Sequence, residues 1–153
     1  RSGGEAVRSP EGVSLHEVGT LAELLEVDSA EANVLDVRCR GTRRFELGAS
    51  RQQADGLWLG DATGLADDAV VVPSAGSSAI VASLAEAIKA LAGRGERPFL
   101  EPHHFDCAGW VANRWCEILP LPKDSKQRLM AIRDPQARLD AVDALMRSRH
   151  VSH

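Results

Sequence analysis

The segment VLDVRCR, residues 34–40, alternates apolar and charged side chains with a period of two. In an extended chain, successive side chains point to opposite faces. Leu35, Val37 and Cys39 therefore share one face, and the charged residues between them share the other. This pattern predicts a half-buried β-strand.

Similar short segments surround this strand, separated by residues that favour turns. The predicted strands are residues 13–18, 21–27, 34–40, 43–47 and 57–61. We expect turns at Gly41-Thr42 and at Ala54–Gly56, because glycine and aspartate are typical of turns. The sequence up to Val72 therefore predicts an antiparallel meander.

The hydrophobic period changes to that of helices after Pro73. Apolar residues recur at steps of three or four, which places them on one buried face before Gly93 ends the helix: Ile80, Leu84, Ile88 and Leu91. A second apolar face follows in residues 105–118, for which Asp106 is the expected N-cap and Pro120 the end. The pattern predicts two amphipathic helices.

Two further helices are predicted in the last thirty residues. Asp124 or Ser125 can begin the third. The Asp134-Pro135 pair begins the fourth, with aspartate as N-cap and proline in the first turn. The chain is therefore expected to have an α+β fold, with a β-rich subdomain at residues 1–72 and a helical bundle at residues 73–150, together forming one domain.

Composition limits the classes of function. The chain has 153 residues, 44% hydrophobic and 26% charged, as is typical of globular proteins. Its net charge of −4 lacks the basic excess of most nucleic-acid binders. No run of apolar residues approaches the roughly 18 needed to cross a bilayer, so no membrane span is expected. Three cysteines without a pairing pattern indicate reduced thiols and a cytoplasmic protein.

Known catalytic motifs are missing from the sequence. It contains no GxxxxGK[ST], GxGxxG, HExxH or GxSxG pattern. One remote enzyme hypothesis is a serine hydrolase that uses Ser74 or Ser77 at the start of a helix. Helix capping explains these serines better, because spacing positions no base near them. We expect a protein that is not an enzyme.

Residues 103–107, together with Cys116, contain histidine, aspartate and cysteine and so suggest a zinc site. The spacing disfavours it. Neighbouring histidines point apart, and the nine-residue step between Cys107 and Cys116 puts the two thiols on different helix faces. A structural loop is preferred, and we expect neither a metal nor a cofactor.

A cluster of arginines could bind phosphate or a stacked base together with Trp58 on the next strand: Arg38, Arg40, Arg43 and Arg44. A solvated sheet face is the competing explanation, because glutamates on the same strands can pair with these arginines across the sheet. An RNA-binding function is therefore kept as an alternative.

Several segments together resemble the N-terminal, substrate-binding domain of Lon proteases. HEVGTLAEL (residues 16–24) and RGTRRF (40–45) resemble its strand pair and G-x-R-R-F signature. The helical part is similar in WVANRW (110–115), EILPLP (117–122) and KQRL (126–129), and in the stretch from Asp134-Pro135 through Arg138-Leu139. The order is the same, and the resemblance spans nearly the whole chain.

The resemblance implies a PUA-like antiparallel β-barrel followed by a C-terminal helical bundle, as in small stand-alone bacterial members without ATPase and peptidase domains. Family members usually begin with a further strand pair, and no such segment precedes Arg1. We therefore expect the barrel to be incomplete at its N-terminus in this chain.

The implied function is recognition of polypeptides rather than their cleavage. Expected partners are unfolded or extended polypeptide segments, and possible ones include a protease or chaperone and further copies of the chain; RNA is the weaker alternative. Arg43, Arg44, Trp58 and Trp110 are the candidate contact residues, since aromatic and arginine side chains are enriched at binding surfaces.

Overall fold

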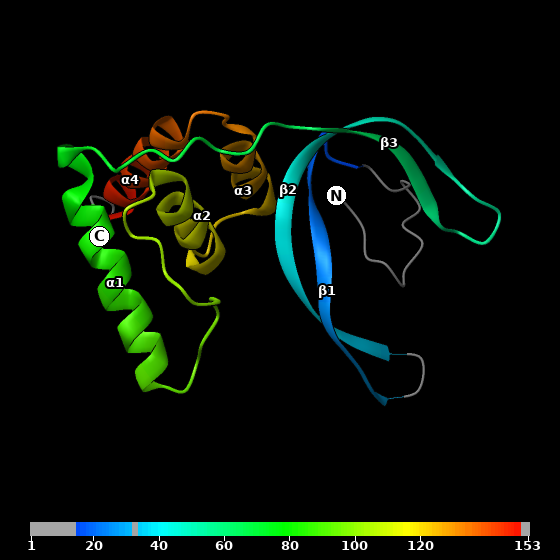
Figure 1. The fold of residues 1–153 in the computed structure, drawn as a ribbon, viewed down its shortest axis with the longest axis horizontal. Helices are drawn as coiled ribbons and strands as arrows, with labels where there is room; N and C mark the ends of the chain where they lie inside the picture. Colours follow the sequence, from blue (N-terminus) through cyan, green and yellow to red (C-terminus); the bar gives the residue numbers. More distant parts are fainter. Residues whose placement is uncertain (1–14, 32–33, 151–153) are drawn as a thin grey trace. The chain divides into compact units, whose positions relative to one another are not determined.

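The structure is a computed structural model that describes residues 15–31 and 34–150. Its elements in chain order are β1 (Val18–Glu31), β2 (Val34–Gln52), β3 (Trp58–Gly64), η1 (Ala75–Ser77), α1 (Ser78–Gly93), α2 (Ala108–Ile118), α3 (Lys123–Ala131) and α4 (Pro135–His150) (Figure 1). The predicted α+β class is confirmed.

The chain divides into two compact units, residues 1–67 and residues 68–153. The first contains the described strands and the second contains the helices. The boundary between subdomains predicted from the sequence, between Val72 and Pro73, lies instead within the extended segment that enters the helical unit.

The described strands form an antiparallel meander in the order β1-β2-β3, as predicted. The predicted turn at Gly41-Thr42 is wrong, because β2 continues through both residues. Gly41 pairs with Ala22 of β1, and the Thr42 hydroxyl donates to the carbonyl of Leu21 at 3.2 Å. Pairing with a long neighbouring strand overrides the local turn preference.

The two ends of the predicted β region have different outcomes. The strand predicted at residues 13–18 is wrong at positions 15–17, because β1 begins at Val18; positions 13–14 lie outside the described residues. The turn at Ala54–Gly56 is confirmed: Gly56 has a φ of 91°, a conformation that favours glycine, and the Asp55 carboxylate accepts from the Leu57 N–H at 3.0 Å.

Gly19 permits a close contact inside the sheet. It lies opposite Phe45, and a Cβ at this position would overlap the Phe45 ring. The ring therefore covers the glycine backbone, which explains why a glycine is accommodated within a strand here.

The helical unit has one apolar core. α2 contacts each of the other three α-helices. The buried core residues are Ile80, Leu84, Ala108, Val111, Ala112, Trp115, Leu129, Leu139 and Val142. The indole N–H of Trp115 donates to the carbonyl of Ile80 at 3.1 Å, which joins α2 to α1. The helical periodicity read from the sequence is thus confirmed.

The predicted helix starts are partly correct. Asp134 caps α4, because its carboxylate accepts from the N–H of Ala137 at 2.6 Å. Asp106 does not cap α2. That helix begins at Ala108, and the carbonyl of Val71 accepts the Ala108 N–H at 2.8 Å. A distant backbone carbonyl therefore replaces the expected side-chain cap. α3 begins at Lys123, one residue before Asp124.

A buried arginine holds the helical unit together. Arg138 of α4 forms two hydrogen bonds with the Asp68 carboxylate, at 2.6 and 3.0 Å. It also donates to the Asn113 side chain at 3.2 Å and twice to the carbonyl of Ile132. All five guanidinium donors are used, which offsets the cost of burying the charge.

By length and composition, one helical segment of the described residues, Ala75–Gly93, could cross a membrane. The core helix of a soluble protein meets the same criterion, and Ile80 and Leu84 of this segment lie in the core. The expectation of no membrane span stays a prediction.

Candidate functional site

One face of the β1–β2 pair is apolar and open to solvent. Leu24 lies opposite Cys39, and Val27 lies opposite Val37. Alternation along β2 adds Leu35 to the same face. We call Leu24, Val27, Leu35, Val37 and Cys39 the apolar sheet face. Leu24 is 61% exposed and Leu35 is 65% exposed.

The half-buried strand predicted at residues 34–40 is therefore wrong in its burial. The alternation correctly placed apolar side chains on one face, but in the described structure both faces of this stretch are exposed. Period two reports only that the two faces differ, and another element must cover a face to bury it. Exposed apolar patches of this kind are typical of contact surfaces.

The opposite face of the same strands carries paired charges. Arg40 forms two hydrogen bonds with Glu23, at 2.5 and 3.1 Å, and Arg38 lies 3.5 Å from Glu26. These are the cross-strand pairs expected for a solvated face. They partly neutralise the arginines that the RNA hypothesis needs.

Two of the predicted contact residues, Arg43 and Arg44, are neighbours on β2, and Trp58 lies far from them along the sheet. Arg43 pairs with Asp67 at 3.4 Å, and Arg44 is its half-buried neighbour on β2. Trp58 lies opposite Gln52, at the far end of β2. Eight residues separate Gln52 from Arg44, roughly 25 Å of strand. The expected platform of arginines and Trp58 does not assemble.

Trp110, the fourth predicted contact residue, is half-buried on α2 and lies among other rings. Its indole has ring-centroid distances of 5.4 Å to Phe105 and 5.6 Å to His103. The Arg114 guanidinium lies over the Trp110 ring at 5.6 Å and over Phe99 at 5.2 Å. These contacts hold the loop of residues 94–107 against α2.

Arg114 also forms an ion pair with Glu117 at 2.5 Å. The Glu117 side chain is 49% exposed, and its partial burial raises its pKa above the ordinary value, against the smaller opposing influence of Arg114 and Lys126. The folded protein therefore binds this proton more tightly than the unfolded chain does.

We expect Glu117→Gln to raise the melting temperature slightly at pH 7, on the order of 1 °C. A raised folded pKa means that the folded state is favoured while the carboxyl is protonated, and that this advantage is lost as pH rises through the folded pKa. At pH 4 the variant should match the parent. Differential scanning fluorimetry at both pH values tests this, with Glu96→Gln, which changes another ion-paired glutamate outside the helices, as the control. A lower melting temperature at pH 7 would contradict it.

The two serines at the start of the helical unit contact Gln136 of α4. The Gln136 amide donates to Ser77 Oγ at 3.0 Å and to Ser74 Oγ at 3.3 Å, and its oxygen accepts the Ser74 N–H at 3.0 Å. Ser74 and Ser77 occupy the predicted N-cap positions, of η1 and α1, but neither hydroxyl forms a capping hydrogen bond. The two hydroxyls also contact each other, at 3.0 Å.

The zinc hypothesis finds no donor cluster in the described part of the chain, where no three histidine, cysteine or acidic side chains are grouped to hold a metal. The two histidines instead make aromatic contacts, since the rings of His103 and His104 both lie beside the Trp110 ring. The segment serves as a packed loop in this structure.

The three cysteines are free thiols with different environments. Cys39 is exposed, whereas burial raises the pKa of the Cys116 thiol. Because the thiolate is the reactive form, we expect iodoacetamide to modify Cys39 first and Cys116 at least about tenfold more slowly. Peptide mass spectrometry over a time course measures the order. Faster modification of Cys116 than of Cys39 would contradict the described environments.

The sequence of residues 2–148 matches the family model of the ATP-dependent protease La (LON) substrate-binding domain. The chain belongs to this family. The Lon substrate-binding domain is a substrate-recognition module, distinct from the catalytic part of the protease. The resemblance described from the sequence is therefore confirmed.

Two solved structures share the fold of this Lon-type domain. The Lon N-terminal domain protein from Xanthomonas campestris has a TM-score of 0.69 and 26% sequence identity, over 84% of this chain and 68% of that one. The N-terminal domain of the Mycobacterium avium complex Lon protease has a TM-score of 0.56 and 17% identity, over 82% and 67%. The second likeness shows the fold alone. No curated protein matches the chain.

Proposed function

We propose that this chain is a non-catalytic module that recognises unfolded or extended polypeptide segments on its apolar sheet face. Its membership of the Lon substrate-binding family supports substrate recognition. The observation that carries the proposal is the exposure of Leu24, Val27, Leu35 and Val37 on one side of the β1–β2 pair.

The physical basis is removal of apolar surface from water. Unfolded polypeptides expose apolar side chains that folded proteins bury, so an apolar sheet face discriminates between the two by chemistry alone. Binding of this kind depends little on salt. RNA binding would instead collapse as salt rises, because it requires release of counterions from phosphates.

The proposed absence of catalysis is supported by the surroundings of the candidate nucleophiles. Among the residues that the structure describes, the hydrogen-bond partners of the Ser74 and Ser77 hydroxyls are each other and the Gln136 amide, which is no general base. Processing of a bound polypeptide would fall to a partner protease or chaperone. We also propose a reducing, cytoplasmic location, in which the exposed Cys39 thiol stays free.

Cys39 offers a direct test, because it is the thiol on the apolar sheet face. We expect a cysteine-free unfolded polypeptide, at about ten times its dissociation constant, to slow alkylation of Cys39 about tenfold. Cys116 on α2 of the helical unit is the internal control, and its rate should not change.

Repeating the measurement at low and high salt, and with single-stranded RNA, separates the two binding hypotheses. Protection of Cys39 by the polypeptide at both salt concentrations supports the proposal. Protection by RNA alone, lost at high salt, overturns it in favour of RNA binding. Equal rates with and without the polypeptide also overturn it.

A further inference from the structure

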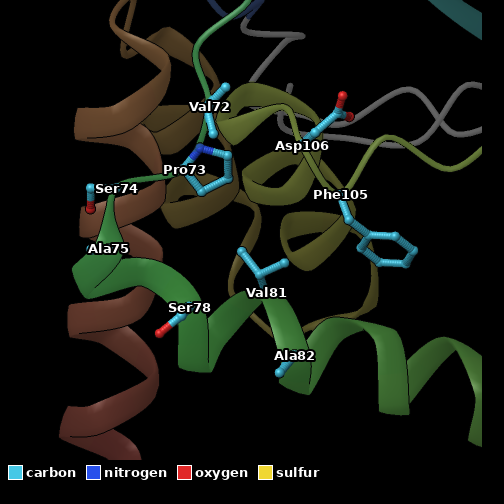
Figure 2. Close-up of a pocket in the computed structure, with 9 residues that line it drawn as sticks. All are labelled: Val72, Pro73, Ser74, Ala75, Ser78, Val81, Ala82, Phe105 and Asp106. Carbon is cyan, nitrogen blue, oxygen red and sulfur yellow. The ribbon is translucent and has the colours of Figure 1, made fainter.

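A groove opens in the helical unit where the extended segment 68–74 meets α1. It has a volume of about 390 Å³. The residues that line it are Val72, Pro73, Ser74, Ala75, Ser78, Val81, Ala82, Phe105 and Asp106 (Figure 2). Figure 2 shows Pro73 and Val81 facing each other, with the Phe105 ring to one side. Six of the nine residues are apolar, and the volume lies in the range of small-ligand sites, roughly 300–1,000 Å³.

The segment beside the groove is extended and has one unpaired edge. Val71 packs against the core, and its carbonyl accepts the Ala108 N–H. Its neighbours Val70 and Val72 are 87% and 71% exposed. Among the described residues, the backbone N–H groups of Val70 and Val72 have no hydrogen-bond partner. Such an edge is where an extended peptide can add backbone hydrogen bonds.

The only charged residue type that lines the groove is acidic. Asp106 is exposed at its rim, and none of the nine lining residues is a lysine or an arginine. Phe105 is held in place by its edge contact with the Trp110 ring. The lining therefore combines an anchored apolar wall with one carboxylate.

We propose that this groove binds an extended peptide segment with one apolar side chain between Pro73 and Val81 and a basic residue beside Asp106. The apolar wall selects the apolar side chain, the Asp106 carboxylate selects the basic residue, and the unpaired edge at Val70 and Val72 selects an extended backbone. The inference rests on the proposed function for its class of ligand, but it uses a second site in the other unit.

The test uses the full chain and a short fluorescein-labelled peptide in which leucine is followed by lysine, with fluorescence anisotropy as the readout. Ala82→Phe places a ring in the groove, and we expect it to weaken binding at least about tenfold. Ala90→Phe is the matched control, since Ala90 is also exposed on α1 but does not line the groove. It should bind like the parent.

The charge contribution is measured with Asp106→Asn and a second peptide that carries glutamate in place of lysine. We expect Asp106→Asn to weaken binding of the lysine peptide about threefold and to remove most of the preference over the glutamate peptide. Asp124→Asn, an exposed aspartate of α3, is the control. Circular dichroism establishes that each variant is folded.

Two results would overturn the inference: equal binding by the parent and Ala82→Phe, or equal loss in Ala82→Phe and Ala90→Phe. Equal binding of both peptides by the parent would also contradict the proposed basic residue. If the groove variants have no effect while Cys39 is still protected by unfolded polypeptide, the groove inference fails and the proposed function stands. If the groove variants have no effect and unfolded polypeptide does not protect Cys39, both the groove inference and the proposed function are wrong.

Discussion

Replacing Leu24 and Val37 with serine is expected to weaken binding of an unfolded polypeptide at least about tenfold. Both side chains are more than half exposed on the apolar sheet face, so contact with a ligand would remove most of their remaining surface from water. Each is expected to contribute about 1 kcal/mol, and two such losses exceed a tenfold change in affinity. Fluorescence anisotropy with a labelled unfolded polypeptide measures the effect.

The matched control lies on the opposite face of the same strands. Glu23→Gln with Arg40→Gln removes one cross-strand ion pair and leaves the apolar side chains in place. This variant should bind the polypeptide like the parent. If it loses affinity as much as the serine variant does, the charged face rather than the apolar one makes the contact, and the proposed site is wrong.

Arg138→Leu is expected to lower the free energy of unfolding by about 3–5 kcal/mol, the cost typical of removing one partner of a buried ion pair. The Arg138 side chain is 1% exposed, and its loss takes the guanidinium away from Asp68, from Asn113 and from the carbonyl of Ile132. Urea unfolding followed by tryptophan fluorescence reports mainly on this unit, because two of the three tryptophans, Trp110 and Trp115, lie on α2.

Two variants separate this effect from a general loss of charge. Arg147→Leu removes an exposed pair with Asp143 and should leave the urea midpoint close to that of the parent. Arg138→Lys keeps the charge but not the planar fork of donors, so it should also destabilise the protein. A cost below about 1 kcal/mol for Arg138→Leu would contradict the assignment of Arg138 as the central polar contact of the helical unit.

Local patterns in the sequence predicted the elements whose causes are themselves local. The steps from Ile80 to Leu91 determine a helix because a 3.6-residue period brings those side chains to one face. Asp134 caps its helix within a single turn, and the glycine at position 56 supplies the positive φ that its turn requires. These features need no distant partner.

Features that depend on a distant partner were missed. Asp106 looks like a helix cap in the sequence, but it is the carbonyl of Val71 that accepts the N–H of Ala108, the first residue of α2. Gly41-Thr42 resembles a turn, yet pairing with β1 keeps it in a strand. Ser77 is buried against Gln136, a residue far away in the chain. In each case a contact from another element supplies the hydrogen bond that local reasoning assigned to a neighbour.

The candidate site shows the same division. The sequence by itself determined that Leu35, Val37 and Cys39 share a face, because alternation is a property of any extended chain. It also determined the family, through segments spread along the whole chain. Only the tertiary structure decided that this face is open to solvent, that Trp58 lies far from Arg44 along the sheet, and that Arg138 is buried. Exposure is set by which elements pack together, and a period in one segment carries no information about what covers it.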